Sequence, residues 1–144
     1  MQKYQYLIAP LLGWVVAQSL KFIFSMRRQG LQWGEVVQSG GMPSSHTALT
    51  VALATVIGVN LGFDSAIFAV AATFAAVVIY DAMGVRRTTG EQTVAINELA
   101  KASKHKLTTK LDKARGHTPV EVVVGGLVGV AVGLEYLEVE RLYA

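Results

Sequence analysis

One histidine of this 144-residue sequence follows a run that is typical of a helix start. His46 comes directly after Pro43, Ser44 and Ser45, and either serine is a natural N-cap. The backbone N–H groups of a helix start are suited to an anion, so His46 would stand beside any anion bound there. The competing interpretation is an ordinary capped helix with a histidine at its surface.

A second histidine stands at another helix-start pattern. Thr118 and Glu121 have the spacing of a capping box, with Pro119 at the first helical position. Glu121 also follows His117 by four residues, so its carboxylate could instead orient the imidazole. The sequence leaves both interpretations of Glu121 open.

Two groups of cations accompany these histidines. Lys21 and Arg28 are seven residues apart, which places them on one face if a single helix contains both. Two cations that snorkel from a helix end would have the same spacing. Arg86 and Arg87 suit phosphate oxygens, and they also suit lipid head groups without specificity.

The combination of histidines and cations favours phosphoryl transfer without a metal. No acidic cluster suits magnesium, and two histidines without cysteine make a poor zinc site. We therefore expect no metal and no cofactor. Cations could hold the phosphoryl oxygens while one imidazole attacks phosphorus and the other protonates the leaving group.

The composition indicates that a membrane positions these residues. Hydrophobic residues make up 52% of the chain and charged residues 16%, against about 25% charged in a soluble domain. This excludes a disordered chain and makes a nucleic-acid-binding module a poor fit, so we expect no nucleic-acid partner. Cysteine is absent, which excludes a disulfide framework.

Four apolar stretches are candidates for membrane spans: Tyr4–Leu20, Thr47–Phe63, Ser65–Tyr80 and Pro119–Leu134. Each is shorter than the roughly 20 residues that cross a bilayer, but four together predict a membrane protein. We expect an all-α bundle of about four short transmembrane helices, forming a single domain over 1–144. No A-x-A-like cleavage site follows the first stretch, so we expect it to remain as a helix.

The distribution of charge predicts the orientation of the bundle. If all four stretches span, 11 of the 13 lysines and arginines lie in segments 21–45 and 82–117, on one side of the membrane. The positive-inside rule places that side, and with it the histidines, in the cytoplasm. Both termini would then lie outside the cell membrane.

Two further segments have alternative interpretations. Residues 90–113 combine a thin apolar stripe with lysines, which indicates a helix on the anionic inner membrane surface, or else a flexible basic loop. Gly125, Gly129 and Gly133 repeat every four residues, a spacing that lets membrane helices approach closely. Packing within one subunit is the favoured interpretation, and a homodimer face is the alternative.

Two short motifs resemble the type 2 phosphatidic acid phosphatase superfamily, which includes vanadium haloperoxidases. The superfamily's lysine, six residues, then Arg-Pro is matched by Lys21 and Arg28, with Gln29 in place of the proline. Its Pro-Ser-Gly-His motif is matched by the run from Pro43 to His46, with Ser45 in place of the glycine.

The third motif of the superfamily is matched more distantly. Arg86 or Arg87 would be its arginine, His117 its histidine and Glu121 its aspartate, with roughly thirty additional residues before the histidine. The strings GMPSSHT, YDAMGVRR and GHTPVEV are similar to those of a small divergent branch of bacterial and plastid membrane proteins. The resemblance to that branch covers nearly the whole chain.

The resemblance implies a role for each of these residues. His117 would be the nucleophile, oriented by Glu121, and His46 the general acid for the leaving alcohol. The side chains implied to bind the substrate phosphate are Lys21, Arg28, Ser45, Arg86 and Arg87. No metal would be required, and vanadate would inhibit.

The function that we expect is that of a membrane lipid phosphate phosphatase acting at the cytoplasmic leaflet. A site that faces the cytoplasm favours lipids made inside the cell, such as phosphatidylglycerol phosphate or phosphatidic acid. The alternative is a non-enzymatic membrane protein that binds anionic lipid or a partner through its basic loop.

Overall fold

The described part of the chain is built from five α-helices. The computed structural model describes residues 4–29, 41–103 and 116–143, and no strand occurs among them. The helices are α1 (Gln5–Gln29), α3 (Ser45–Leu61), α4 (Ala66–Met83), α5 (Val85–Ala102) and α6 (Pro119–Leu142). The all-α class predicted from the sequence is confirmed.

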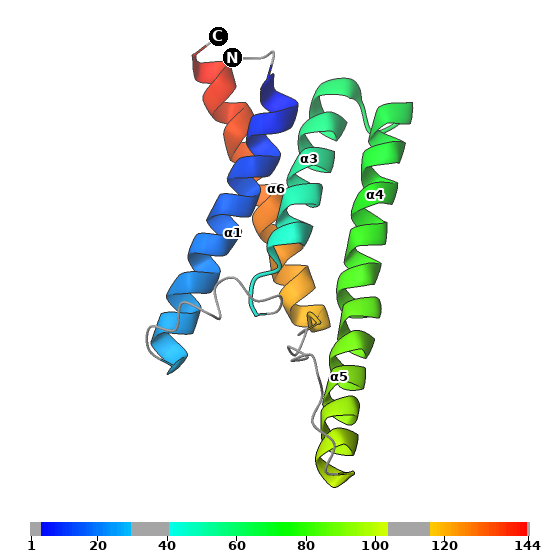
Figure 1. The fold of residues 1–144 in the computed structure, drawn as a ribbon. Helices are drawn as coiled ribbons and strands as arrows, with labels where there is room; N and C mark the ends of the chain where they lie inside the picture. Colours follow the sequence, from blue (N-terminus) through cyan, green and yellow to red (C-terminus); the bar gives the residue numbers. More distant parts are fainter. Residues whose placement is uncertain (1–3, 30–40, 104–115, 144) are drawn as a thin grey trace.

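The helices form a membrane bundle in which α1 and α4 run in one direction and α3 and α6 run in the other (Figure 1). By length and composition, α1, the α4–α5 rod and α6 can each cross a membrane, and α3 is a shorter apolar helix of 17 residues. α3 packs against α1, α4 and α6 and so occupies the centre of the bundle. Both termini lie at one end, and α3 and α6 start toward the other end.

Glycines let α6 and α1 approach α3 closely. A Cβ added at Gly129 would lie 2.6 Å from the Ala48 carbonyl oxygen, and one at Gly133 would lie 3.0 Å from Thr55 Cβ. A Cβ at Gly13 of α1 would lie 3.1 Å from Ala48 and Ala52. The repeated glycines of α6 therefore serve packing within one subunit, the interpretation that the sequence favoured.

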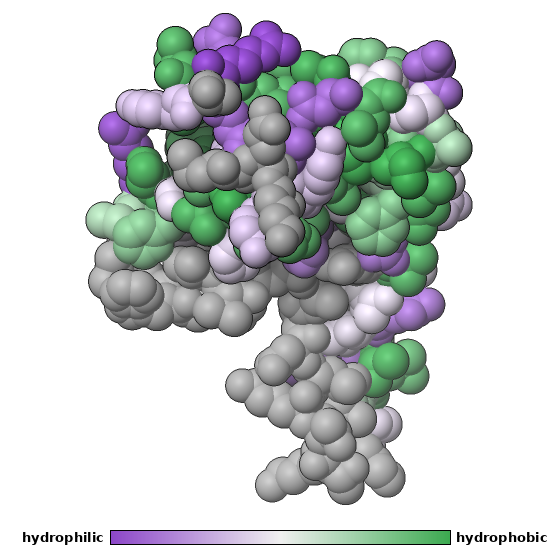
Figure 2. Space-filling view, turned by 90° about the horizontal axis from the view of Figure 1, so that it is seen from above, coloured by the Kyte–Doolittle hydropathy of each residue, from purple (hydrophilic) through white to green (hydrophobic). Residues whose placement is uncertain are grey.

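The outward faces of the helices are apolar. Ile67, Val70, Phe74 and Val77 lie along one face of α4, and each is more than half exposed. Seen from the end that holds the termini, hydrophobic surface covers much of the flank on the α4 side (Figure 2). Such a face suits hydrocarbon, because lipid takes the place of the core against which a soluble helix would pack.

α5 continues α4 rather than turning across the base of the bundle. The two helices are separated only at Gly84, and in Figure 1 they form one long rod that projects beyond the other helices. Residues 85–102 are therefore helical, but their helix extends the line of α4 instead of lying across the base of the bundle, as a helix on the membrane surface would. The remainder of the basic segment, 104–113, lies outside the described residues.

Candidate active site

The starts of α3 and α6 are joined through their backbones. The Ser44 N–H group donates a hydrogen bond of 3.0 Å to the Glu121 carbonyl oxygen. One turn further along α6, a Cβ added at Gly125 would lie 2.5 Å from the Ser44 carbonyl oxygen. Only glycine allows this approach, because real Cβ atoms are essentially never found closer than 3.0 Å to such an atom.

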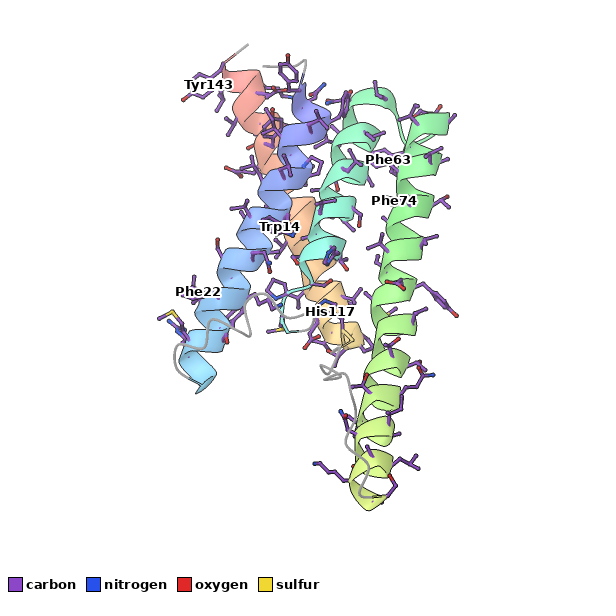
Figure 3. All side chains as sticks on the ribbon, in the orientation of Figure 1. Trp14, Phe22, Phe63, Phe74, His117 and Tyr143 are labelled. Atoms are coloured by element: carbon purple, nitrogen blue, oxygen red, sulfur yellow. The ribbon has the colours of Figure 1, made fainter. Side chains whose placement is uncertain are left out.

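His117 is buried where α6 begins, at the opposite end of that helix from Tyr143 (Figure 3). Its backbone N–H donates to the carbonyl oxygen of Ala82, near the end of α4, at 2.9 Å. Its side-chain Nδ1 lies 3.1 Å from Glu121 Oε2. A carboxylate can only accept, so this contact favours the tautomer with its proton on Nδ1 and a lone pair on Nε2.

Glu121 makes the contacts that both of its possible roles require. Its Oε2 accepts from the Thr118 N–H at 3.0 Å, and its own N–H donates to Thr118 Oγ1 at 3.4 Å. The capping box is therefore confirmed. Because Oε2 also contacts the His117 ring, the cap and the orientation of the imidazole do not exclude each other.

The start of α3 is capped in an unusual way. Ser44 occupies the N-cap position, but its side chain makes no hydrogen bond to a backbone N–H of the helix. Its Oγ instead accepts a bond of 2.9 Å from the Thr47 hydroxyl. The hydroxyl that normally satisfies a helix start is engaged elsewhere, which suits a helix start that receives an anion. Ser45 is buried in this first turn, whereas His46 is exposed.

Lys21 approaches the same region from α1. Its side chain is buried, at 8% exposure, although it carries an ammonium group. A Cβ added at Gly41 would lie 3.1 Å from Lys21 Cε, and Gly41 has φ +87°, which L side chains rarely adopt. Lys21 therefore lies against the loop that leads into Pro43 and the first turn of α3. α1 continues to Gln29, so Lys21 and Arg28 belong to one helix, as their proposed shared face required.

The side chains of three predicted phosphate-binding residues lie outside the described part of the structure: Arg28, Arg86 and Arg87. The backbone places Arg28 in the last turn of α1 and the other two arginines in the first turn of α5. Their contacts with phosphate stay predictions. Among the described residues, no group of three or more His, Cys, Asp or Glu is arranged to hold a metal ion.

Sequence reasoning missed the contacts that assemble the site. The Ser44 N–H and the Ala82 carbonyl both bind the start of α6, and neither group differs chemically from the backbone of any other residue. Gly125 was recognised as a packing residue, but its partner Ser44 was not. Only the periodic glycine spacing signalled this contact, and spacing does not say which segment lies opposite.

The assembled arrangement brings complementary groups to one end of the bundle. It contains an imidazole paired with a carboxylate, a buried lysine and a helix start with an exposed histidine. Cations and helix-start N–H groups can stabilise phosphoryl oxygens, and a carboxylate-paired imidazole can act as a nucleophile.

Two comparisons with known proteins found sequences similar to this chain. The profile of the Divergent PAP2 family matches residues 2–132. The chain is 39% identical over 142 residues to the Uncharacterized membrane protein YuiD of Bacillus subtilis, a match that covers 89% of this chain and 88% of that protein. No solved structure matches the chain.

Proposed function

The chain belongs to the Divergent PAP2 family, and on that premise we propose that it is a metal-independent membrane phosphatase acting on a lipid phosphate. The substrate is a phosphomonoester such as phosphatidylglycerol phosphate or phosphatidic acid, and it enters from the cytoplasmic leaflet. The observation that carries the proposal is the contact of 3.1 Å between His117 Nδ1 and Glu121 Oε2, at a helix start that is joined to the first turn of α3.

In the first step, Nε2 of His117 attacks phosphorus. The N–P bond forms as the P–O bond to the lipid alcohol breaks, and His46 donates a proton to the departing alkoxide. The imidazole of His117 gains positive charge during attack, and the carboxylate of Glu121 stabilises that charge. In the second step, water gives a proton to His46 and attacks the phosphohistidine, which releases inorganic phosphate and restores both histidines.

The cations bind the non-bridging oxygens of the phosphoryl group. The buried position of Lys21 beside the loop that leads into α3 supports this role, because it holds a cation next to the helix start that is proposed to bind the phosphate. Ser45 lies in the first turn of α3, where its N–H and hydroxyl can donate to the same oxygens. Arg28 and one arginine of the Arg86–Arg87 pair complete the set in this proposal.

The placement of charge supports a site that faces the cytoplasm. The histidine-bearing helix starts lie at the bundle end opposite the termini, and 11 of the 13 cations belong to the segments that flank them in sequence. Both termini then lie outside the plasma membrane. This orientation favours lipids whose phosphate is exposed on the inner leaflet.

The test is phosphate release by the purified protein in detergent, from a panel that includes phosphatidylglycerol phosphate, phosphatidic acid and an aryl phosphate. We expect hydrolysis without added metal, undiminished by EDTA, and loss of hydrolysis in His117→Ala. A wild-type protein that releases no phosphate from any of these substrates would overturn the proposal.

A second candidate function rests on the structural roles that the same residues already have. His117 is 4% exposed, and the capping box is a sufficient structural reason for Glu121. A non-enzymatic protein that binds anionic lipid through its basic segment would keep these residues for folding alone. In that case, vesicle binding would survive substitution of His46 and be lost when lysines of 101–113 are replaced.

A further inference from the structure

We propose that Gly125 is a positioning residue for the phosphate site, although the atoms nearest to an added Cβ there belong to Ser44 and not to a histidine. It lets the Ser44 carbonyl lie against α6, and this close approach sets where the first turn of α3 stands relative to the His117–Glu121 pair. The inference rests on the proposed function, because it concerns the same anion site.

The first argument is that Ser44 is held through both its backbone N–H and its backbone carbonyl. Its N–H donates to the Glu121 carbonyl, and its carbonyl accepts from Ala48 N–H while lying against Gly125. Glu121 and Gly125 are four residues apart and so lie on the same face of α6. Ser44 is therefore held against Glu121 and Gly125 of α6. The next two residues of the chain are Ser45 and His46.

The second argument is that Glu121 connects the two halves of the site. Its carbonyl oxygen accepts a hydrogen bond from the Ser44 N–H, and its side-chain Oε2 contacts His117 Nδ1. The start of α6 is also held to α4 by the hydrogen bond from His117 N–H to the Ala82 carbonyl. A shift of Ser44 relative to Glu121 therefore moves Ser45 and His46 while His117 stays in place.

The third argument comes from the neighbouring glycines. A Cβ at Gly125 would need the Ser44 carbonyl to move by about 0.5 Å to reach even the 3.0 Å limit. A Cβ at Gly126 would meet only Thr47 Cγ2, at an ordinary 4.0 Å. A Cβ at Gly129 would be nearly as crowded, at 2.6 Å, but against Ala48 rather than Ser44. Alanine at Gly126 therefore tests the change of helix propensity alone, and alanine at Gly129 tests crowding away from Ser44. Alanine at Gly125 adds the contact with Ser44.

The experiment compares Gly125→Ala, Gly126→Ala and Gly129→Ala in the full-length protein in detergent. It measures the affinity for inorganic orthovanadate, the kcat and KM for phosphatidic acid in mixed micelles, and the thermal midpoint. Because a misplacement of about 1 Å can cost about 10²-fold in rate, we expect Gly125→Ala to lose about 10- to 100-fold in kcat. We expect its orthovanadate affinity to fall by about 10-fold, with little change in KM.

The controls give the opposite pattern. Gly126→Ala should match wild type in orthovanadate affinity, and Gly129→Ala should lose thermal stability as Gly125→Ala does while keeping most of its affinity. Equal losses of affinity in Gly125→Ala and Gly129→Ala would overturn the inference and leave the phosphatase proposal standing. A wild type that binds orthovanadate but hydrolyses no lipid phosphate would overturn the phosphatase, and the variants would still decide the role of Gly125.

A gentler pair of variants covers the case in which Gly125→Ala does not fold. Thr47→Val keeps the side-chain shape but removes the hydroxyl bond of 2.9 Å to Ser44 Oγ, and Thr55→Val removes a comparable bond to Val51 further along α3. Loss of one such bond should weaken orthovanadate binding about fivefold in Thr47→Val, with no change in Thr55→Val. Unchanged affinity in both variants would contradict a positioning role for the Ser44 contact.

Discussion

Replacing Glu121 by glutamine separates the two roles of this side chain. One oxygen, Oε2, accepts from both the Thr118 N–H and His117 Nδ1. The glutamine carbonyl oxygen can occupy the same position and accept from both groups, so the cap and the imidazole tautomer are kept. Only the negative charge is lost.

The size of the effect follows from the distance to His117. At 3.1 Å, an effective dielectric of about 20 gives an attraction of about 5 kcal/mol between the carboxylate and an imidazolium. The Glu121 side chain is 20% exposed, so we take about half of this value, roughly 3 kcal/mol, to allow for screening by water. Because each 1.36 kcal/mol is tenfold in rate, Glu121→Gln should lower kcat by about 100-fold.

The matched control is Thr118→Ala, which weakens the same cap without removing charge. It deletes the hydroxyl that accepts the Glu121 N–H at 3.4 Å and should cost about 1 kcal/mol of stability. Both variants would be compared in phosphate release and in thermal unfolding in the same detergent. We expect Glu121→Gln to lose rate with little loss of stability, and Thr118→Ala to lose stability while keeping most of its rate.

The reasoning fails if the two variants do not separate in this way. A Glu121→Gln protein with wild-type kcat would mean that the carboxylate only caps α6. A glutamine variant as unstable as Thr118→Ala would mean that the amide oxygen does not replace Oε2, and its lost rate would then say nothing about charge.

Three further predictions test other parts of the site. His117→Ala should abolish both turnover and covalent phosphorylation, whereas His46→Ala should slow turnover by about 10²- to 10⁴-fold and recover partly with an aryl phosphate, whose leaving group needs less protonation. Equal sensitivity of the two variants to the leaving group would refute this division of roles. Gly41→Ala should reduce orthovanadate affinity, because φ +87° disfavours a side chain and the new Cβ would press on Lys21 Cε. Calorimetric titration with orthovanadate would measure this loss and compare it with the loss in Lys21→Met. Reporter fusions should place the C-terminus outside and residues 88–113 in the cytoplasm, and a cytoplasmic C-terminus would refute the inward-facing site.

Local patterns in the sequence were enough to predict the helices and some of their ends. Apolar stretches separated by charged residues predicted the membrane bundle, because hydrocarbon tolerates few charges. The capping box of Thr118 and Glu121 was also predictable, since both of its hydrogen bonds join residues three apart in the chain. The helical period likewise predicted that Lys21 and Arg28 share one helix face.

The assembly of the site was decided by tertiary contacts that no local pattern encodes. Ser44 binds Glu121, and His117 binds Ala82, through backbone groups that every residue carries. Residue type therefore gives no sign of which N–H will meet which carbonyl. The spacing of Gly125 predicted a close approach, but that the approaching atom is the Ser44 carbonyl follows only from how α3 and α6 pack. The chemical groups of the candidate site are thus local properties of the chain, whereas their arrangement depends on contacts between segments far apart in sequence.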